Sequence, residues 1–534
     1  MKVTVAFLLC VVACGEAIIY ENASYSPEER QFLDFKLNNP KTIVWTKSSG
    51  DPVEIREVVA VNTDHFNNQL FVDTISSFSA ERLPERITNA KGAGAFGYFV
   101  VTNDVSKYTY ADLFNGIGKK TPLVARFSAV VQNKGGTDLG RESRGFAVKF
   151  YTKQGNLDLA CLHIPVFLYR DPNFVSHLMH GVSRNPQTNL ISSTSRWDVA
   201  IQRPATLNTL FWLYSDYGIP NGYRKADFFP VHTYELANKH GETHYVRFNF
   251  RTEQGFSAFT NQQAAEVSGR DPDYFVKDLF NAIGRGDYPS WRLEMDVLTK
   301  HDLQTVDYNP FDVTGLWTNG TFTTVQIGRL VLNKNVENVF RDLELAAFNP
   351  SNLVPGIPGP VDNLFKARRT AYRMAQNYRL GSNPNKILIN MPLYARTYNR
   401  DGKPPVRGNM GNAPHYHPNS FNGPMPYVDE NQPAKTLRVL GSMAVDFQPL
   451  TYFYNHIIES EAHRRRFISN LVDSLESVVP PVLDKVLELF DLIDHDLKRR
   501  VAVGLEAAYA RRRADRGPPS INTPIRNFPT AVNY

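Results

Sequence analysis

Cysteine is scarce in this sequence. The 534 residues include three, Cys10, Cys14 and Cys161. The first two lie in residues 1–17, MKVTVAFLLCVVACGEA, which have the basic start, apolar centre and small-residue end of a secretory signal peptide. Cleavage near Ala17 would leave Cys161 alone, so an internal disulfide is excluded and stability must come from packing or oligomerisation. We therefore expect a secreted, extracellular protein.

Long apolar runs and an excess of one charge are also missing. Beyond residue 17, no run approaches the roughly 20 apolar residues of a membrane-spanning helix, so no membrane span is expected. Lys and Arg number 59 against 53 Asp and Glu, and they are scattered apart from ARRRADR at residues 510–516. This distribution does not indicate a nucleic-acid partner, and the basic run is most simply a solvated surface. Two N-x-S/T sequons, at Asn22 and Asn319, fit the glycosylation of a secreted chain.

A glycine-rich stretch, ERITNAKGAGAFGYF at residues 85–99, has Gly92, Gly94 and Gly97 in G-x-G-x-x-G spacing. In a dinucleotide-binding fold, this motif follows a buried strand and opens a helix. Here a charged segment interrupted by Pro84 precedes it, and the β-type run YFVVT follows it. The motif therefore does not indicate a nucleotide site.

Three regions of different composition follow one another along the chain. Short alternating runs rich in Val, Phe, Tyr and Thr dominate residues 99–256 and predict half-buried antiparallel strands, for example at 145–153 and 243–252. Residues 345–435 are rich in Pro, Gly and Asn, which is typical of a long wrapping segment. From about Thr451, apolar residues recur at three- and four-residue steps and predict helices. The predicted fold class is α+β, with a barrel or sandwich and a helical C-terminal unit.

One strongly helical segment lies inside the wrapping region, ARRTAYRMAQNYRLG at residues 367–381. Its spacing places Arg368, Tyr372 and Arg379 on one helix face. A guanidinium one turn from a tyrosine favours the phenolate, which is a good ligand for ferric iron, and a second arginine could pair with an anionic edge of the same cofactor. Taken alone, the same pattern also fits a solvated helix surface.

Long segments of the chain resemble the haem catalase family. They include FSAERLPERITNAKGAGAFGYFVVT, TPLVARFSAVVQNKGGTDLGRESRGFAVKFYT, IPVFLYRDPNFVSHLMHGVSRNPQTNL and RLVLNKNVENVFRDLELAAFNPSNLVPGI, and the similarity runs from about Lys41 to Arg512. The resemblance implies an eight-stranded antiparallel β-barrel, a wrapping segment with the haem-ligand helix, a C-terminal helical domain and a homotetramer. It also implies that the glycine-rich run lets backbone pack closely behind the distal haem wall.

The corresponding division of the chain is a signal peptide at 1–17, an N-terminal arm at 18–75, a barrel core at 76–334, a wrapping segment at 335–450, a C-terminal helical domain at 451–512 and a flexible tail at 513–534.

The resemblance assigns haem-binding roles to seven residues. Tyr372 matches the axial ligand of the haem iron, and Arg368 matches its supporting guanidinium. The residues that would neutralise the propionates, edge the pocket and pack on the porphyrin are Arg86, Arg126, Arg379, His232 and Phe167. Haem b is therefore the expected cofactor.

Two positions depart from the family pattern on the distal side. Asn89 stands where the family has a histidine, and Leu162 stands where it has an asparagine. Peroxide cleavage needs a group that moves a proton between the two oxygens, and a carboxamide does not titrate near neutral pH. Loss of such a group costs about 10² to 10⁴ in rate. Ser128, which matches the hydroxyl that supports the distal histidine, would have no base to support.

His163 is the nearest candidate substitute for the missing base. Successive side chains of a strand point to opposite faces, so His163 and Cys161 should both face away from the haem unless the strand bulges. Val175 stands where the family has a ring over the haem face, which would loosen the pocket.

The family's optional NADPH site looks degraded in this sequence. Asn208, Tyr217 and Asn249 stand where His, Arg and His are expected, although Arg251 and Trp317 are compatible with the site. We expect no bound nicotinamide.

These observations favour a secreted catalase-like pseudoenzyme that binds haem and is inactive or very weak in hydrogen peroxide dismutation. Two alternatives stay open. One is an active secreted haem catalase or peroxidase, in which water, His163 or Asn89 gives residual catalysis. The other is a haem-free structural or storage scaffold, against which the retained Tyr372 and its arginines argue, although buried arginines can also persist in ion pairs.

Overall fold

The computed structural model describes residues 25–59, 69–406, 408–419, 421–431 and 447–515. The predicted signal peptide, Asn22 and residues 516–534 lie outside these ranges. Contacts divide the chain into two compact units. Of the described residues, the first unit comprises those within 25–165, 219–313 and 317–431, and the second comprises 166–218, 314–316 and 447–515. The domain bounds given above stay predictions.

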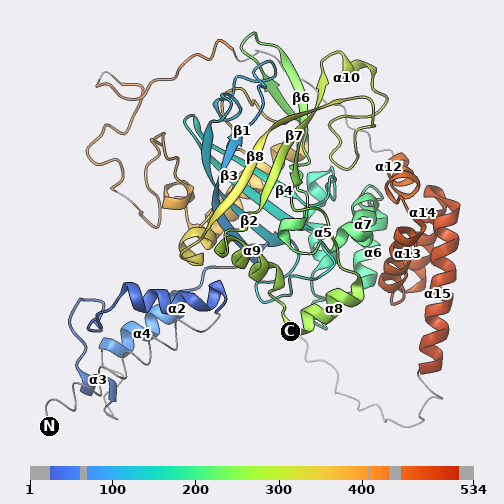
Figure 1. The fold of residues 1–534 in the computed structure, drawn as a ribbon, viewed down its shortest axis with the longest axis horizontal. Helices are drawn as coiled ribbons and strands as arrows, with labels where there is room; N and C mark the ends of the chain where they lie inside the picture. Colours follow the sequence, from blue (N-terminus) through green and yellow to red (C-terminus); the bar gives the residue numbers. More distant parts are fainter. Residues whose placement is uncertain (1–24, 60–68, 407, 420, 432–446, 516–534) are drawn as a thin grey trace, which may run out of the picture. The chain divides into compact units, whose positions relative to one another are not determined.

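The first unit is built on one antiparallel sheet of eight strands, in the order β4-β3-β2-β1-β8-β7-β6-β5 (Figure 1). The strands are β1 (Gly92–Val101), β2 (Lys120–Ala129), β3 (Arg144–Thr152), β4 (Gly155–Leu162), β5 (Tyr234–Ala237), β6 (Thr243–Thr252), β7 (Ser290–Thr299) and β8 (Thr323–Asn335). Two bridges, Leu162 to Phe229 and Phe228 to Phe250, connect the β4 edge back to β6. The sheet therefore curls, and the predicted α+β fold with an eight-stranded antiparallel barrel is confirmed.

Alternation along the strands gives the curled sheet an inner and an outer face. Phe127, Phe146 and Cys161 belong to the core inside the sheet, where the rings of Phe127 and Phe146 stack with centroids 4.8 Å apart. Their neighbours in the chain, such as Arg126 and Ser128, point to the outer face. Polar side chains can therefore collect on the outer face of β2 to β4.

The glycine-rich stretch lies inside β1 and not in a loop. A Cβ at Gly94 would lie 2.3 Å from the carbonyl oxygen of Ala125, and one at Gly97 would lie 2.0 Å from that of Val331. These glycines therefore permit close approach to the strands on both sides of β1, in agreement with the exclusion of a nucleotide site.

The wrapping segment packs on the outer face of β2 and β3. One buried cluster contains Val124, Tyr151, Leu343, Phe348 and Ile389, and the Tyr151 hydroxyl donates to the Ile389 carbonyl at 2.6 Å. The helix α11 (Asn363–Leu380), which lies within this segment, contacts the sheet where Arg368 Nη2 lies 3.5 Å from the Ala160 carbonyl of β4.

Residues 99–256 were expected to be mainly strands, but they also contain three helices. These are α5 (Val175–Val182), α6 (Ser193–Gln202) and α7 (Thr206–Tyr214). Every residue of α7 is buried, so the helix is apolar all round and shows no amphipathic period in the sequence.

The second unit packs α5 to α7 with the C-terminal helices. These are α12 (Gln448–Tyr452), α13 (Glu461–Leu475), α14 (Pro480–Ile493) and α15 (His495–Asp515). The ring of Phe211 lies with its centroid 6.0, 5.3 and 5.7 Å from those of Phe453, Phe467 and Phe490. The predicted helical C-terminal unit is confirmed, with a break at the extended Asp494 between α14 and α15.

The remaining helices lie in the first unit. They are α2 (Pro27–Asn38), α3 (Ile55–Val59), α4 (Gln69–Ala80), α8 (Asn261–Arg270), α9 (Tyr274–Gly284) and α10 (Asp302–Thr305). None of the helices in the described ranges is both long and apolar enough to cross a membrane.

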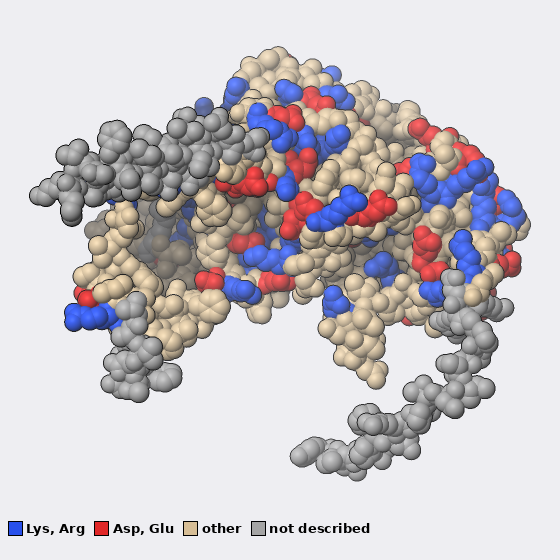
Figure 2. All heavy atoms as spheres, turned by 60° about the horizontal axis from the view of Figure 1, so that its bottom comes forward, with Lys and Arg blue, Asp and Glu red and all other residues tan. Residues whose placement is uncertain are grey.

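Basic and acidic side chains lie interspersed on the face shown in Figure 2. The arginines of α15 follow this pattern, because Arg500 pairs with Asp496 at 2.7 Å and Arg512 pairs with Glu476 at 2.8 Å. This pairing fits the interpretation of the basic run as a solvated surface.

Candidate haem site

Helix α11 carries the residues expected to hold haem iron. Asp362 caps its first turn, where a carboxylate oxygen accepts the Phe365 N–H at 2.8 Å. Gly381 ends the helix with a φ of 84°, which favours glycine. The helix begins at Asn363 and not at Ala367. Asp362 was not among the predicted site residues, although Asp before a helical run is a typical N-cap signal.

A chain of hydrogen bonds connects Tyr372 to Asp362 through two buried side chains. Arg368 donates from Nη2 to the Tyr372 hydroxyl at 3.0 Å and from Nη1 to His232 Nε2 at 2.7 Å. His232 Nδ1 lies 3.0 Å from Asp362 Oδ2. Because Arg368 can only donate, this arrangement requires a neutral His232 with its proton on Nδ1.

The ionisation of these groups follows from their surroundings. Burial lowers the pKa of His232, even though Asp362 acts in the opposite direction. Burial would raise the pKa of Asp362, but His232, the Phe365 N–H and Arg368 lower it overall. A neutral imidazole therefore separates the Asp362 carboxylate from Arg368, whose positive charge stays directed at the Tyr372 oxygen.

Three further arginines lie around one carboxylate, Glu344. Arg86 Nη1 is 3.7 Å from Glu344 Oε1, and Arg379 Nη1 is 3.9 Å from Oε2. Arg126, on the outer face of β2, donates to the Ala90 carbonyl at 3.0 Å. Burial lowers the pKa of all three arginines, that of Arg126 to about 10.

Each of these arginines also has a buried nitrogen without a hydrogen-bond partner. The atoms are Arg86 Nη1, Arg126 Nε and Arg379 Nη1. An unpaired buried donor costs about 1–3 kcal/mol, and a charged one more. Three cations beside one carboxylate also lack balancing negative charge. Both features fit a ligand with two carboxylates, so the residues present fit the propionate edge of haem.

The predicted distal wall is a row across three strands. Ser128, Gly145 and Leu162 are register partners in β2, β3 and β4. Asn89 lies beside this row and donates from Nδ2 to Ser128 Oγ at 2.8 Å. A Cβ at Gly145 would lie 2.4 Å from Asn89 Nδ2, so glycine leaves room for the carboxamide.

Leu162 is buried and lies on the same outer face as Ala160. The Ala160 carbonyl is 3.5 Å from Arg368 Nη2, which connects this face to α11. The structure therefore brings Asn89, Ser128 and Leu162 to the side of the sheet that carries α11. None of these three side chains titrates near neutral pH.

The two residues beside Leu162 are engaged elsewhere. Cys161 packs in the core inside the sheet, and burial raises the pKa of its thiol. His163 is buried, and its Nδ1 accepts the backbone N–H of Arg144 at 2.9 Å. The nearest imidazole in the sequence thus binds the start of β3.

Two predicted pocket residues lie in the second unit. The Phe167 ring meets that of Tyr169 edge-on at 5.1 Å between centroids. Val175 begins α5 and is 40% exposed. Their contact with haem stays a prediction.

The residues compared with the NADPH site have partners within the chain. Asn208 Nδ2 donates to the Thr314 carbonyl at 2.8 Å, and Asn249 Nδ2 donates to Asp296 at 2.7 Å. The Tyr217 ring packs on that of Trp212, with centroids 4.9 Å apart. Arg251 pairs with Asp227 at 2.9 Å, and Trp317 Nε1 donates to the Pro310 carbonyl at 2.9 Å. The expected absence of nicotinamide stays a prediction.

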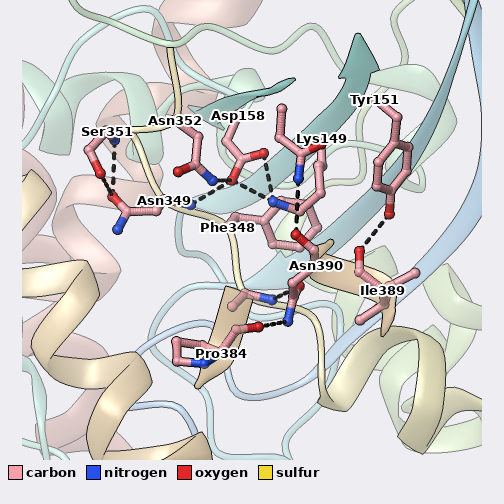
Figure 3. Close-up of polar contacts among 12 residues, drawn as sticks. Lys149, Tyr151, Asp158, Phe348, Asn349, Ser351, Asn352, Pro384, Ile389 and Asn390 are labelled. Atoms are coloured by element: carbon pink, nitrogen blue, oxygen red, sulfur yellow. Dashed lines mark hydrogen bonds and ion pairs between the residues drawn. The ribbon is translucent and has the colours of Figure 1, made fainter. Parts of the chain in front are cut away.

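A buried polar network that was not predicted holds the segment before α11 (Figure 3). Lys149 Nζ lies 2.8 and 2.7 Å from the two carboxylate oxygens of Asp158, and both side chains are almost fully buried. Asp158 Oδ2 also accepts the Asn349 N–H and Asn352 Nδ2, both at 2.8 Å. The pair therefore ties β3 and β4 to the chain that leads into the helix.

Asn390 joins the chain before α11 to the chain after it. Its Nδ2 donates to the Pro384 carbonyl at 2.9 Å (Figure 3). The same Nδ2 donates to the Leu345 carbonyl at 2.8 Å, and Oδ1 accepts the Ala347 N–H at 2.7 Å. Gln376, one turn after Tyr372, donates to the Phe348 carbonyl at 2.6 Å. The orientation of the helix is thus set at both ends and along its length.

Comparison with known proteins finds the same family throughout. A family model described as Catalase matches residues 46–423. The catalase of Ascaris suum is 37% identical over 494 residues, which cover 90% of this chain and 91% of the relative. The catalase of Methanosarcina barkeri is 40% identical over 443 residues, covering 82% and 88%.

Solved structures agree with the sequence relatives. A fungal catalase superposes with a TM-score of 0.82 at 32% identity and covers 87% of this chain and 97% of its own. Catalase A from Saccharomyces cerevisiae gives a TM-score of 0.80 at 33% identity, with 86% and 99% covered. With a family model that spans well over half of the chain and relatives this similar along most of it, the chain belongs to the catalase family.

Proposed function

We propose that this chain binds haem b beside α11 and turns over hydrogen peroxide only weakly, as a pseudoenzyme of the catalase family. Haem, when bound, would supply a ferric centre at which peroxide can be reduced and oxidised. Tyr372 would hold the iron, with the Arg368 guanidinium 3.0 Å from its oxygen. Arg86, Arg126 and Arg379 would receive the propionates.

The composition of the distal row carries the proposal of weak turnover. The Asn89 carboxamide donates its N–H to Ser128 and cannot accept and release a proton near neutral pH. Leu162 offers no hydrogen bond that could orient peroxide. A missing general acid–base group lowers the rate by about 10² to 10⁴.

The similarity to catalases supports a rival function. The relatives and solved structures described above are all named catalases, and the side of the site around Tyr372 has every residue that the resemblance requires. On this view the chain is an active catalase in which an ordered water moves the proton. His163 is less suited to this role, since its Nδ1 already accepts the Arg144 N–H.

Restoring the distal pair tests the proposal against this rival. We expect Asn89→His combined with Leu162→Asn to raise oxygen release from peroxide, per bound haem, by about 10² to 10⁴. The matched control is Asn89→Gln with Leu162→Asn, which restores the amide at 162 but adds no base, and it should give little gain. An equal rate in the unmodified chain and the histidine variant, with the same haem spectrum, would refute the proposal.

Haem binding itself has a separate test. The purified chain should develop a Soret band when haem is added, and Tyr372→Phe should shift that band because the axial oxygen is lost. A chain that never binds haem would instead support the haem-free scaffold.

We also propose that the chain is secreted after loss of residues 1–17, assembles as a homotetramer and binds no NADPH. Asn319 lies in an exposed turn, which supports its glycosylation. Mass spectrometry of protein recovered from culture medium would give the mature N-terminus and the glycan occupancy.

A further inference from the structure

The loop between β2 and β3 places a lysine beside the arginine cluster. Lys134 Nζ lies 3.8 Å from Glu344 Oε2, the carboxylate that Arg86 and Arg379 also approach. The Lys134 side chain is 57% exposed, whereas those of Arg86 and Arg379 are 16% and 6% exposed. Lys134 therefore occupies the solvent edge of the cluster.

The backbone of this loop is fixed at two points. Glu85, the neighbour of Arg86 in the chain, accepts the Lys134 N–H at 3.3 Å and Asn133 Nδ2 at 3.2 Å. The buried Lys91 donates to the Gly136 carbonyl at 2.7 Å. These bonds hold the backbone of Lys134 near Arg86, while its side chain is largely exposed to solvent.

The charges at this edge leave a place for a ligand carboxylate. Glu344 is the acidic partner that the structure gives to Arg86, Arg379 and Lys134 together, and Arg126 adds a further buried cation. One carboxylate cannot balance four cations. A lysine at the mouth of such a site can leave Glu344 and pair with an incoming anion, because the contact of 3.8 Å is long for an ion pair.

We propose that Lys134 is a further haem-binding residue of this chain, which contacts the outermost propionate and favours porphyrins with free carboxylates over their esters. This inference rests on the proposed haem binding and adds to it a residue that selects the ligand. The contribution should be modest, since a partly exposed ion pair is screened by solvent and salt.

Titration of the full-length chain with two ligands tests this assignment. Haem and haem dimethyl ester, which lacks the free carboxylates, are each added to the haem-free protein, and the Soret band gives a Kd for each. The measured quantity is the ratio of the ester Kd to the haem Kd. We expect Lys134→Met to lower this ratio about threefold, and Lys134→Glu to lower it about tenfold.

The controls separate the role of Lys134 from other effects. The Kd of the ester should not change in either variant, which also shows that the fold is intact. Lys153→Met removes an exposed lysine at the β3–β4 turn and should leave the ratio unchanged. The decrease of the Kd ratio caused by Lys134→Met should be smaller at high salt.

Two negative outcomes are distinguishable. If haem binds the unmodified chain but Lys134→Met and Lys134→Glu have the same ratio of ester Kd to haem Kd as that chain, the assignment of Lys134 is wrong and the proposed haem binding stands. If neither ligand gives a Soret band with the unmodified chain, the proposed function and this inference both fall.

Discussion

At the position expected to carry the distal base, Asn89 has a φ of 63° and donates to Ser128 Oγ at 2.8 Å. Asn and His are both more common than most residues in this left-handed region. The backbone at 89 therefore does not prevent the return of a histidine. Asn89→His should therefore change the acid–base chemistry at this position without changing the local backbone. For this reason, Asn89→His with Leu162→Asn is a suitable test of the missing base.

Gly145 is predicted to be essential to the distal wall. A Cβ at this position would lie 2.4 Å from Asn89 Nδ2 and 2.8 Å from Ser128 Oγ. We expect Gly145→Ala to displace the Asn89 side chain and to destabilise the fold by about 1–3 kcal/mol. Gly135→Ala is the control, because nothing lies within 4 Å of its Cβ position. Equal urea midpoints for the two variants would contradict this account of the wall.

His232 should make the protein sensitive to mild acid. Burial lowers its pKa below the ordinary 6.5, so the folded protein binds fewer protons here than the unfolded chain. The stability that goes with a neutral His232 is complete above pH 6.5 and falls as the pH drops from 6.5 toward the lowered value, by about 1.4 kcal/mol per unit of pKa difference. Asp362, whose pKa is also lowered, acts in a separate window below its ordinary 3.8.

Urea midpoints measured at several pH values would show this effect. His232→Gln can still bridge Arg368 and Asp362 but does not titrate, so its midpoint should fall less between pH 6.5 and 4.5. Replacement of the exposed His456 by Gln is the control. An unchanged pH slope in the His232 variant would mean that this histidine is not held neutral.

Among the elements, α11 is positioned by contacts that the neighbouring segments make. Lys149 and Asp158 tie β3 and β4 to residues 349 and 352, and Asn390 joins the chain on both sides of the helix. Helix α11 is therefore positioned by buried polar groups. A buried charge is costly when its partner is removed.

We expect Lys149→Met to cost about 3–5 kcal/mol, because it leaves the Asp158 charge buried without its counter-ion. The pair Lys149→Met and Asp158→Asn removes both charges and keeps an acceptor for the Asn349 N–H, so it should recover most of this loss. A double-mutant cycle from urea unfolding measures the coupling. Losses that simply add would show that the two side chains act independently.

The elements differ in how far the sequence predicts them. Strands such as β3 and β6 and the helix α11 follow from their two-residue and 3.6-residue periods, and their bounds differ by few residues from the prediction. Helix α7 was missed because burial on all sides removes its period. The burial of Lys149 and Asp158 could not be predicted, because a charged residue in an alternating strand is expected to face solvent. The spacing of Arg368, Tyr372 and Arg379 on one face of α11 was visible in the sequence. The other site residues were accessible only through the family resemblance, because they come from the segment before β1, from β2, from β4 and from loops.

For the whole molecule, exposed apolar side chains of α2 bear on the proposed tetramer. Phe32 and Phe35 in α2 are 74% and 66% exposed, and α2 has no buried residue. An exposed apolar face of this kind is typical of an interaction surface, so it supports the proposed tetramer. We expect Phe32→Ser with Phe35→Ser to lower the mass measured by light scattering, while the isolated exposed Ile117→Ser does not. Tetramers of unchanged mass would show that this face lies outside the interface.

The most direct measurement of the central claim is the initial rate of oxygen release by the unmodified, haem-loaded chain, per haem, beside the catalase of Methanosarcina barkeri. Because Asn89 and Leu162 cannot move a proton, we expect a rate lower by about 10² or more at neutral pH. A rate comparable to that of the relative would contradict the account.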